Sequence, residues 1–173
     1  MAEDSGVFSN DDILYLAGFL DGEGCFSISH NGSGNVHTLS VEQTDQRVLE
    51  WCAATFGGTV RSKVRRAESR ECTFEWFLRR KEPLIRLLRA LVPHLKVKLV
   101  PASILLEYCL RFNRGVPSRV PYTEEDHEVA AQYIALMRIA NSTGRGSSTK
   151  KDDLRASITA IGGVRVAVEK PNA

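Results

Sequence analysis

The sequence predicts an α+β domain with the element order αββαββα, built on one four-stranded antiparallel sheet with helices on one face. Three observations support this prediction. Apolar residues recur at helical spacing over residues 11–22, two runs of alternating residues form hairpin patterns, and each hairpin precedes another helical stretch. The two ββα halves are alike in pattern but share no sequence repeat.

The chain of 173 residues is 43% hydrophobic and 25% charged, as is typical of one globular domain. We expect that domain over residues 9–161, between flexible ends at 1–8 and 162–173.

The first helix is expected over residues 11–22, with Ser9 or Asn10 as its cap. It carries two apolar stripes at i, i+3, i+4, i+7 spacing: Ile13, Leu16, Ala17 and Leu20, and then Tyr15, Gly18, Phe19 and Gly22. One stripe is enough for a helix that rests on its own core. The second stripe, with two glycines, predicts the close approach of another backbone, and the alternative is a helix buried on all sides of one domain.

Two hairpins account for the predicted sheet. The first joins strands at 25–30 and 36–43 through a turn-rich segment, and the second joins strands at 59–66 and 71–79. Each strand alternates apolar with polar residues, so each has one core face and one polar face. The remaining helices are expected at 45–56, 83–92, 97–112, 124–141 and, more briefly, 152–161.

Positive charge gathers in the second hairpin, where eight basic residues stand against three acidic ones between Thr59 and Lys81. Such a concentration is typical of a phosphate-binding surface, although a solvated hairpin face without a partner is an equal alternative. A polar, basic sheet face also suits the DNA major groove. A strand of about nine residues reaches about 30 Å, which corresponds to about nine base pairs. The competing interpretation is a sheet face covered by another protein.

The segment from Leu16 to Gly24 ends in two carboxylates, Asp21 and Glu23, and it occurs once in the chain. Acidic groups at a helix C-terminus are disfavoured by up to about 1 kcal/mol. Carboxylates kept at this position therefore indicate a nearby cation.

Other classes of protein are disfavoured. No apolar run reaches the roughly 18 residues that span a bilayer, and the first residues lack a signal-peptide pattern. The four cysteines (Cys25, Cys52, Cys72 and Cys109) lie far apart, which predicts reduced thiols and no zinc site. We therefore expect a soluble intracellular protein with no membrane partner, in a compartment that the residues leave open.

The stretch from Tyr15 to Gly24 resembles the LAGLIDADG motif of homing endonucleases, with both acidic positions and both flanking glycines present. Residues 41–47, 95–98 and 141–151 resemble further segments of that family, and the order αββαββα resembles its domain. The likeness covers about residues 8–160 and is greatest to the single-motif, homodimeric branch. Glu23 replaces the aspartate that is usual in this branch, although glutamate occurs there elsewhere in the family.

The resemblance implies a site-specific DNA endonuclease that binds a long pseudo-palindromic duplex as a homodimer and cuts both strands across the minor groove. Mg²⁺ is the implied cofactor; Mn²⁺ or Ca²⁺ could occupy the same sites, Ca²⁺ without cleavage, and no small-molecule cofactor is expected. Glu23 and the carbonyl of Gly22 would bind metal, while Asp21 would be structural. Gln43, Arg47 and Lys98 would surround the metals and order the attacking water.

One Glu23 is too little for two metals, so two copies are expected to meet through Tyr15, Gly18, Phe19 and Gly22. The residues expected to contact DNA are polar residues of the sheet and loops: Ser27, Ser29, Asn31, Ser33, Asn35, Thr38, Ser40, Thr59, Arg61, Lys63, Arg65, Arg66, Arg70, Thr73, Glu75, Arg145, Lys150 and Lys151. The alternative function is a non-cleaving nucleic-acid binder on the same scaffold, either an intron RNA maturase or a transcription regulator.

Overall fold

The computed structural model describes residues 8–31, 34–63, 72–113 and 122–143. The predicted short helix at 152–161 and the predicted tail lie outside these ranges. The helices are α1 (Asn10–Glu23), α2 (Gln46–Phe56), α3 (Lys81–Leu91), the one-turn 3₁₀ helix η1 (Val92–His94), α4 (Leu99–Arg111) and α5 (Glu124–Thr143). The strands are β1 (Gly24–Asn31), β2 (Gly34–Gln43), β3 (Thr59–Lys63) and β4 (Thr73–Leu78).

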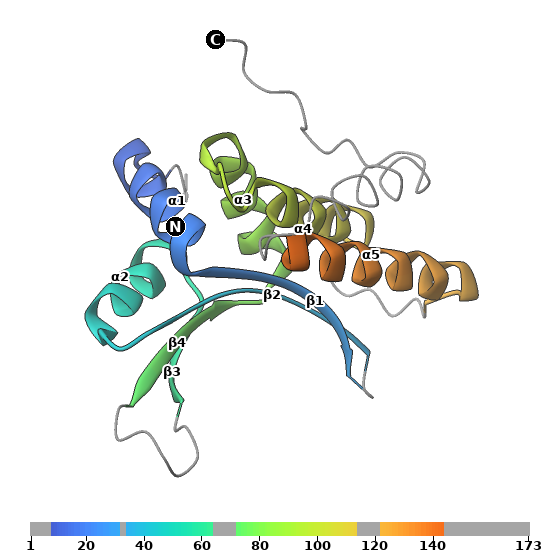
Figure 1. Ribbon diagram of the computed structural model, residues 1–173, viewed down its shortest axis with the longest axis horizontal. Coiled ribbons are helices and arrows are strands. Elements are labelled where there is room, and N and C mark those ends of the chain that lie inside the picture. The colour runs from blue at the N-terminus through green and yellow to red at the C-terminus, as the bar shows by residue number, and fades with distance from the viewer. Residues whose placement is uncertain (1–7, 32–33, 64–71, 114–121, 144–173) are drawn as a thin grey trace, which may run out of the picture.

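The four strands form one antiparallel sheet in the order β1-β2-β4-β3. The two hairpins join through β2 and β4, where Leu39 pairs with Leu78. Figure 1 shows the sheet as an arch with the helices on its convex side and an open concave side beneath. The predicted fold class is therefore confirmed.

Local hydrogen bonds explain where the helices begin and end. Ser9 caps α1 by accepting from the backbone N–H of Asp12 at 3.1 Å, and Asp45 caps α2 by accepting from that of Arg47 at 2.9 Å. Helix α2 ends at Gly57 and Gly58, which both have positive φ. A Cβ on Gly58 would lie 2.6 Å from the carbonyl oxygen of Phe77, so glycine is required there.

Helix α4 begins at Leu99, two residues later than predicted. The backbone N–H groups of Lys96, Val97 and Lys98 donate to the carboxylate of Asp21 on α1, so these residues form an approach to the helix. Pro101 falls in the first turn, where its missing N–H has no intrahelical partner to lose.

The core lies between the sheet and the helices. Trp76, Phe26, Leu39 and Leu78 are fully buried from the strand side, and the indole of Trp76 donates to the carbonyl of Gly57 at 2.8 Å. His37 is a polar residue on this largely apolar face. Its ring lies 5.8 Å from that of Tyr108, and neither ring nitrogen has a hydrogen-bond partner within the described residues.

Burial, followed by the positive charge of Lys81, lowers the pKa of His37 to about 4. In the unfolded chain the same group titrates near its ordinary value of about 6.5. Because the folded state holds the neutral ring, the stability that it contributes is present above pH 6.5 and is lost as the pH falls towards 4. We expect His37→Phe to reduce this loss by about 1–3 kcal/mol, after allowance for partial solvent screening.

The measurement is urea unfolding at pH 7.5 and pH 4.5. His94→Gln, at an exposed position of η1, is the matched control and should keep the wild-type pH dependence. An equal loss of stability in wild type and His37→Phe would contradict the prediction.

Candidate active site and nucleic-acid interface

The two carboxylates at the end of α1 have different surroundings. The carboxylate of Asp21 accepts three backbone N–H groups, from Lys96 at 2.9 Å, Val97 at 3.0 Å and Lys98 at 2.8 Å. These donors precede the first turn of α4, whose amino end carries partial positive charge. The neighbouring helix therefore offsets the unfavourable position of Asp21 at the end of α1.

Glu23 is the last residue of α1, and its side chain is exposed. It makes no hydrogen bond or ion pair within the part of the chain that the structure describes. The chain then turns directly into β1 at Gly24, where a Cβ would lie 2.5 Å from the carbonyl oxygen of Leu20. Glycine at this position lets the helix end abruptly and leaves Glu23 at the junction with the sheet.

Two of the other predicted catalytic residues lie on segments that adjoin this junction. Gln43 ends β2 two residues after Val41, which pairs with Gly24, and its side-chain oxygen accepts from the N–H of Thr44 at 3.0 Å. Lys98 immediately precedes α4, and its backbone N–H is bonded to Asp21. Asp21 thereby links the end of the motif to the segment that carries Lys98.

Arg47 has a different local partner. Its guanidinium is 88% exposed and forms an ion pair with Asp45 at 2.7 Å, and this bond lowers the pKa of Asp45 to about 2. Both residues line an open cleft of about 650 Å³ between α1 and α2, together with Asp11, Asp12, Tyr15, Val48 and Trp51. The structure shows Arg47 bonded to Asp45 and not to Glu23.

Glu23 and the carbonyl of Gly22 are oxygen donors, which suit a hard cation such as Mg²⁺, and the last carbonyls of a helix lack intrahelical partners. Within the described ranges, no group of three or more His, Cys, Asp or Glu side chains could hold a metal ion. One copy of the described structure therefore offers one free carboxylate at the motif, and a complete side-chain site needs further ligands.

The two stripes of α1 have opposite environments. Ile13, Leu16, Ala17 and Leu20 are buried, as expected for the stripe that rests on the core. The second stripe faces solvent: Tyr15 is 58% exposed, Gly18 and Gly22 are exposed, and Phe19 is half-buried. The alternative of a helix buried on all sides is therefore wrong.

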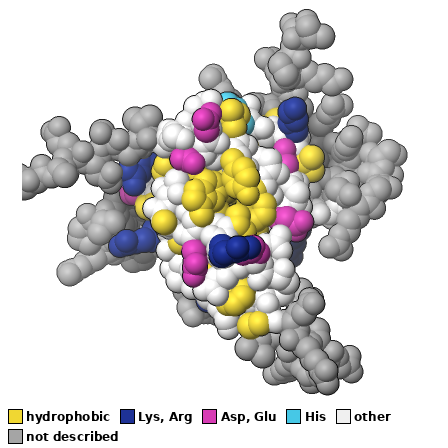
Figure 2. All heavy atoms as spheres, turned by 90° about the vertical axis from the view of Figure 1, so that its left-hand side faces the viewer, with side chains coloured by type: hydrophobic (Ala, Val, Ile, Leu, Met, Phe, Trp, Pro, Cys, Tyr) yellow, Lys and Arg dark blue, Asp and Glu magenta, His cyan; other side chains and the backbone are white. Residues whose placement is uncertain are grey.

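This exposed stripe belongs to an apolar surface. Figure 2 shows hydrophobic side chains gathered near the middle of the face that carries α1 and α2, with charged side chains around them. Leu14 on α1 is 46% exposed, and Tyr15 meets the ring of Trp51 edge-on at 5.1 Å. A Cβ on Gly18 or Gly22 would meet nothing within 4 Å, so another backbone can approach closely here.

The concave side of the sheet, called the outer face below, carries mainly polar side chains. Strand alternation from the helix-facing residues assigns it Cys25, Ser27, Ser29, Asn31, Val36, Thr38, Ser40, Glu42, Thr59, Arg61, Lys63, Thr73, Glu75, Phe77 and Arg79. Ten of the predicted DNA contacts lie there. The other residues of this face, Cys25, Val36, Glu42, Phe77 and Arg79, were not among the predicted contacts, although alternation along the strands indicates their side.

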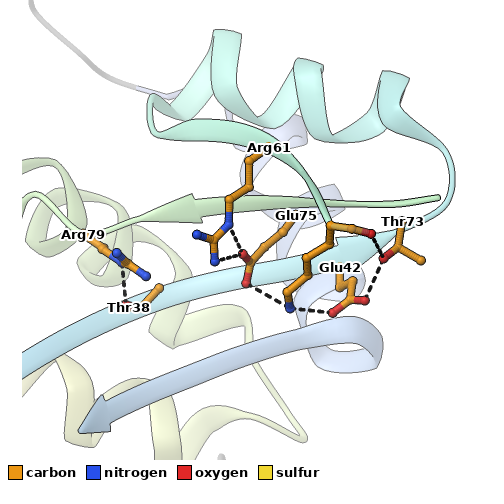
Figure 3. Close-up of polar contacts among 7 residues, drawn as sticks. Thr38, Glu42, Arg61, Thr73, Glu75 and Arg79 are labelled. Atoms are coloured by element: carbon orange, nitrogen blue, oxygen red, sulfur yellow. Dashed lines mark hydrogen bonds and ion pairs between the residues drawn. The ribbon is translucent and has the colours of Figure 1, made fainter. Parts of the chain in front are cut away.

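Ion pairs order the outer face (Figure 3). Arg61 binds Glu75, while Lys63 lies 2.8 Å from Glu42 and 3.5 Å from Glu75. The hydrogen bond to Glu42 raises the pKa of Lys63. Thr73 donates to the same carboxylate at 2.9 Å. Two carboxylates thus hold the basic side chains of β3 in place.

One predicted DNA contact lies on the other side of the sheet. Asn35 pairs with His30, and its side-chain oxygen is 3.0 Å from the ring nitrogen Nδ1 of His30. The strand alternation places this pair on the helix-facing side with Ile28 and His37, so Asn35 does not share the outer face with the other described DNA-contact candidates. The predicted contacts that lie outside the described residues are Ser33, Arg65, Arg66, Arg70, Arg145, Lys150 and Lys151.

An αββαββα domain with an open polar sheet face and a free carboxylate at the end of an exposed helix defines the class of homing-endonuclease-like proteins. The family model described as LAGLIDADG endonuclease matches residues 16–99, which run from α1 to the start of α4. Residues 16–99 are therefore similar to the LAGLIDADG endonuclease family, and the resemblance seen at Tyr15–Gly24 is confirmed.

Solved structures show the same fold. The homing endonuclease I-CvuI, in complex with its target, is 19% identical with a TM-score of 0.56, over 88% of this chain and 96% of that one. The archaeal intron-encoded homing endonuclease I-Vdi141I, complexed with DNA, is 19% identical with a TM-score of 0.59, over 88% and 95%. The LAGLIDADG meganuclease I-AabMI, bound to uncleaved DNA, is 16% identical with a TM-score of 0.58, over 92% of this chain and 53% of that one.

A comparison with curated protein sequences returns no match. Among the described helices, none has the length and apolar character needed to cross a membrane.

Proposed function

We propose that this protein is a homodimeric, Mg²⁺-dependent, site-specific DNA endonuclease that cuts both strands of a long pseudo-palindromic duplex. The observation that carries the proposal is the division of the two motif carboxylates. Asp21 is fully engaged by backbone N–H groups, whereas Glu23 is exposed and without a partner in the described residues at the end of an apolar, solvent-facing helix.

A dimer formed through α1 would account both for the exposed apolar stripe of this helix and for the single motif carboxylate left free in the described part of each copy. Pairing α1 with its copy would cover Tyr15 and the open surface at Gly18 and Gly22, and it would bring two Glu23 carboxylates to one axis. The lengths of the similar structures are consistent with a functional unit of two domains. This chain covers 96% of I-CvuI but only 53% of I-AabMI, so the I-AabMI chain is long enough for two such domains.

The roles of the chain's own residues follow from their chemistry. Glu23 and the Gly22 carbonyl would hold Mg²⁺, which supplies an activated water and charge neutralisation for phosphodiester hydrolysis. Lys98 would stabilise the negative charge that develops on the phosphate. Gln43 and Arg47 would hold ordered water, Arg47 by leaving the carboxylate of Asp45.

The outer face would lie in the major groove, where its Arg, Lys, Ser and Thr side chains can meet base edges. Two half-sites of about nine base pairs give a target of roughly 18 base pairs, from the reach of the strands.

The direct test uses a pool of randomised DNA duplexes. Incubation with Mg²⁺ should release one family of sequences cut on both strands, and a chelator should abolish the cut. In Ca²⁺ the selected duplex should be bound and intact. If a specifically bound duplex stays intact in both Mg²⁺ and Mn²⁺, the nuclease proposal fails and a non-cleaving binder on the same scaffold is favoured.

Binding to DNA should weaken steeply with salt. Each phosphate that the protein neutralises contributes a slope of about 0.9 in log affinity against log salt. Six such contacts correspond to a loss of roughly a thousandfold between 50 and 200 mM salt. A titration of a labelled duplex at four salt concentrations measures the slope, and a flat response would contradict a phosphate-contacting surface.

A further inference from the structure

Phe77 is an unusual residue on the outer face. Alternation along β4 places it on the polar side, between Glu75 and Arg79, whereas Phe74 and Trp76 belong to the helix-facing side. Phe77 is half-buried, and unlike Phe74 it does not pack against the hydrophobic core. Packing of the core therefore does not account for an aromatic ring at this position.

Two guanidinium groups flank the ring. The central carbon of Arg61 lies 5.0 Å from the ring centroid, and that of Arg79 lies 4.8 Å from it. These distances are typical of cation–π contacts. Arg79 lies two residues after Phe77, just beyond the end of β4, and Arg61 pairs with Glu75, two residues before Phe77. The two arginines thus approach from opposite directions along the strand.

Each guanidinium is held by a second contact (Figure 3). The Nε of Arg61 donates to Glu75 at 2.7 Å, and the Nε of Arg79 donates to the hydroxyl of Thr38 at 3.1 Å. Arg61 also pairs with Glu75 through a terminal nitrogen, so its Nε and this nitrogen are both engaged by the same carboxylate. Within the described residues, Arg79 uses only its Nε, which donates to Thr38, so both terminal nitrogens remain available to a ligand.

The chemistry of this cluster matches features of the major groove. Two terminal nitrogens of an arginine can donate together to O6 and N7 of a guanine, and an aromatic ring can contact the 5-methyl group of a thymine. The two guanidinium carbons lie within about 10 Å of each other, which corresponds to no more than about three base pairs at about 3.4 Å each.

We propose that Phe77 and Arg79 are specificity-determining residues: Phe77 contacts a thymine methyl group, and Arg79 donates to a guanine within three base pairs of it. Arg61, held by Glu75, is a positioning residue that fixes the ring. The inference rests on the proposed function, because it requires the outer face to lie in the major groove.

The test selects duplexes from a randomised pool in Ca²⁺ with wild type, Phe77→Ala, Phe77→Leu and Arg79→Ala. Each wild-type half-site should contain thymine and guanine within three base pairs. Phe77→Ala should lose the thymine preference and keep the guanine, Phe77→Leu should keep both, and Arg79→Ala should lose the guanine. Gln132→Ala, at an exposed position of α5, is the control and should select the wild-type sequence.

A chemical substitution in the DNA gives a readout that does not depend on the folding of any variant. Replacing that thymine with deoxyuridine removes only the methyl group, so wild-type affinity should fall about fourfold, which corresponds to about 0.8 kcal/mol. Phe77→Ala should bind both duplexes equally.

Unchanged base preferences in Phe77→Ala, or equal wild-type affinity for the two duplexes, overturns this inference alone. If wild type selects no duplex at all, the proposed function fails first.

Discussion

Glu23→Gln is expected to abolish DNA cleavage while DNA binding and folding persist. Glutamine keeps the shape of the side chain but loses the negative charge that a hard cation requires. Because Glu23 has no partner within the described residues, its replacement breaks no contact that holds the fold. Cleavage of the selected duplex should slow by about a thousandfold or more, corresponding to roughly 4 kcal/mol in the barrier. Band-shift titration in Ca²⁺ should give an affinity near that of wild type.

Asp21→Asn is the contrasting variant, because Asp21 lies two residues from Glu23 but contacts three backbone N–H groups. An amide has one acceptor oxygen and an N–H₂ group that faces these donors. Stability to urea should fall by about 1–3 kcal/mol. Glu23→Gln should show no such loss. Cleavage at the wild-type rate in Glu23→Gln would refute the assignment of Glu23 as a metal ligand.

The buried side of helix α1 was predictable from the sequence. The stripe of Ile13, Leu16, Ala17 and Leu20 identified the buried side of α1, since helical periodicity and core burial are local and agree with each other. The second stripe left two outcomes open, the close approach of another backbone or a helix buried on all sides. The exposure of Tyr15 and Gly18 in the structure decides against the buried helix.

Features that depend on pairing between distant segments were not predictable. The late start of α4 depends on Asp21, which lies 75 residues before Lys96. The side of Asn35 depends on how far the hairpin extends: Asn31 pairs with Gly34, so both strands are longer than predicted, and alternation along β2 places Asn35 on the side of His37. The surroundings of Phe77 depend on which residues of β3 and β2 lie beside it.

The ion pairs of the outer face also depend on which strands lie side by side, so the sequence alone did not predict them. Charge counting identified a basic hairpin, but it could not show that Glu42 of β2 lies opposite Glu75 of β4 and that Lys63 contacts both. DNA that binds Arg61 or Lys63 must therefore compete with carboxylates already in place. Such competition penalises incorrect sequences, because a wrong base leaves a charged group without its partner.

Gly18→Glu is expected to convert the protein into a folded monomer that no longer cuts both strands. A Cβ on Gly18 would meet nothing within 4 Å, so the new side chain fits the isolated domain. Replacing glycine inside a helix should also stabilise that domain by about 0.5–1 kcal/mol. In a dimer paired through α1, two glutamates would face each other across the axis in an apolar contact, and burying such unpaired charges costs several kcal/mol.

Sedimentation and light scattering at micromolar concentration should give twice the chain mass for wild type and the chain mass for Gly18→Glu. The matched control is Ala131→Glu, which places the same side chain at an exposed position of α5 and should leave the dimer intact. Because each copy contributes one Glu23, loss of the dimer should abolish double-strand cleavage even though every catalytic residue is still present. A Gly18→Glu protein that keeps its dimer mass, or that cuts both strands as a monomer, would show that α1 does not form the interface that completes the site.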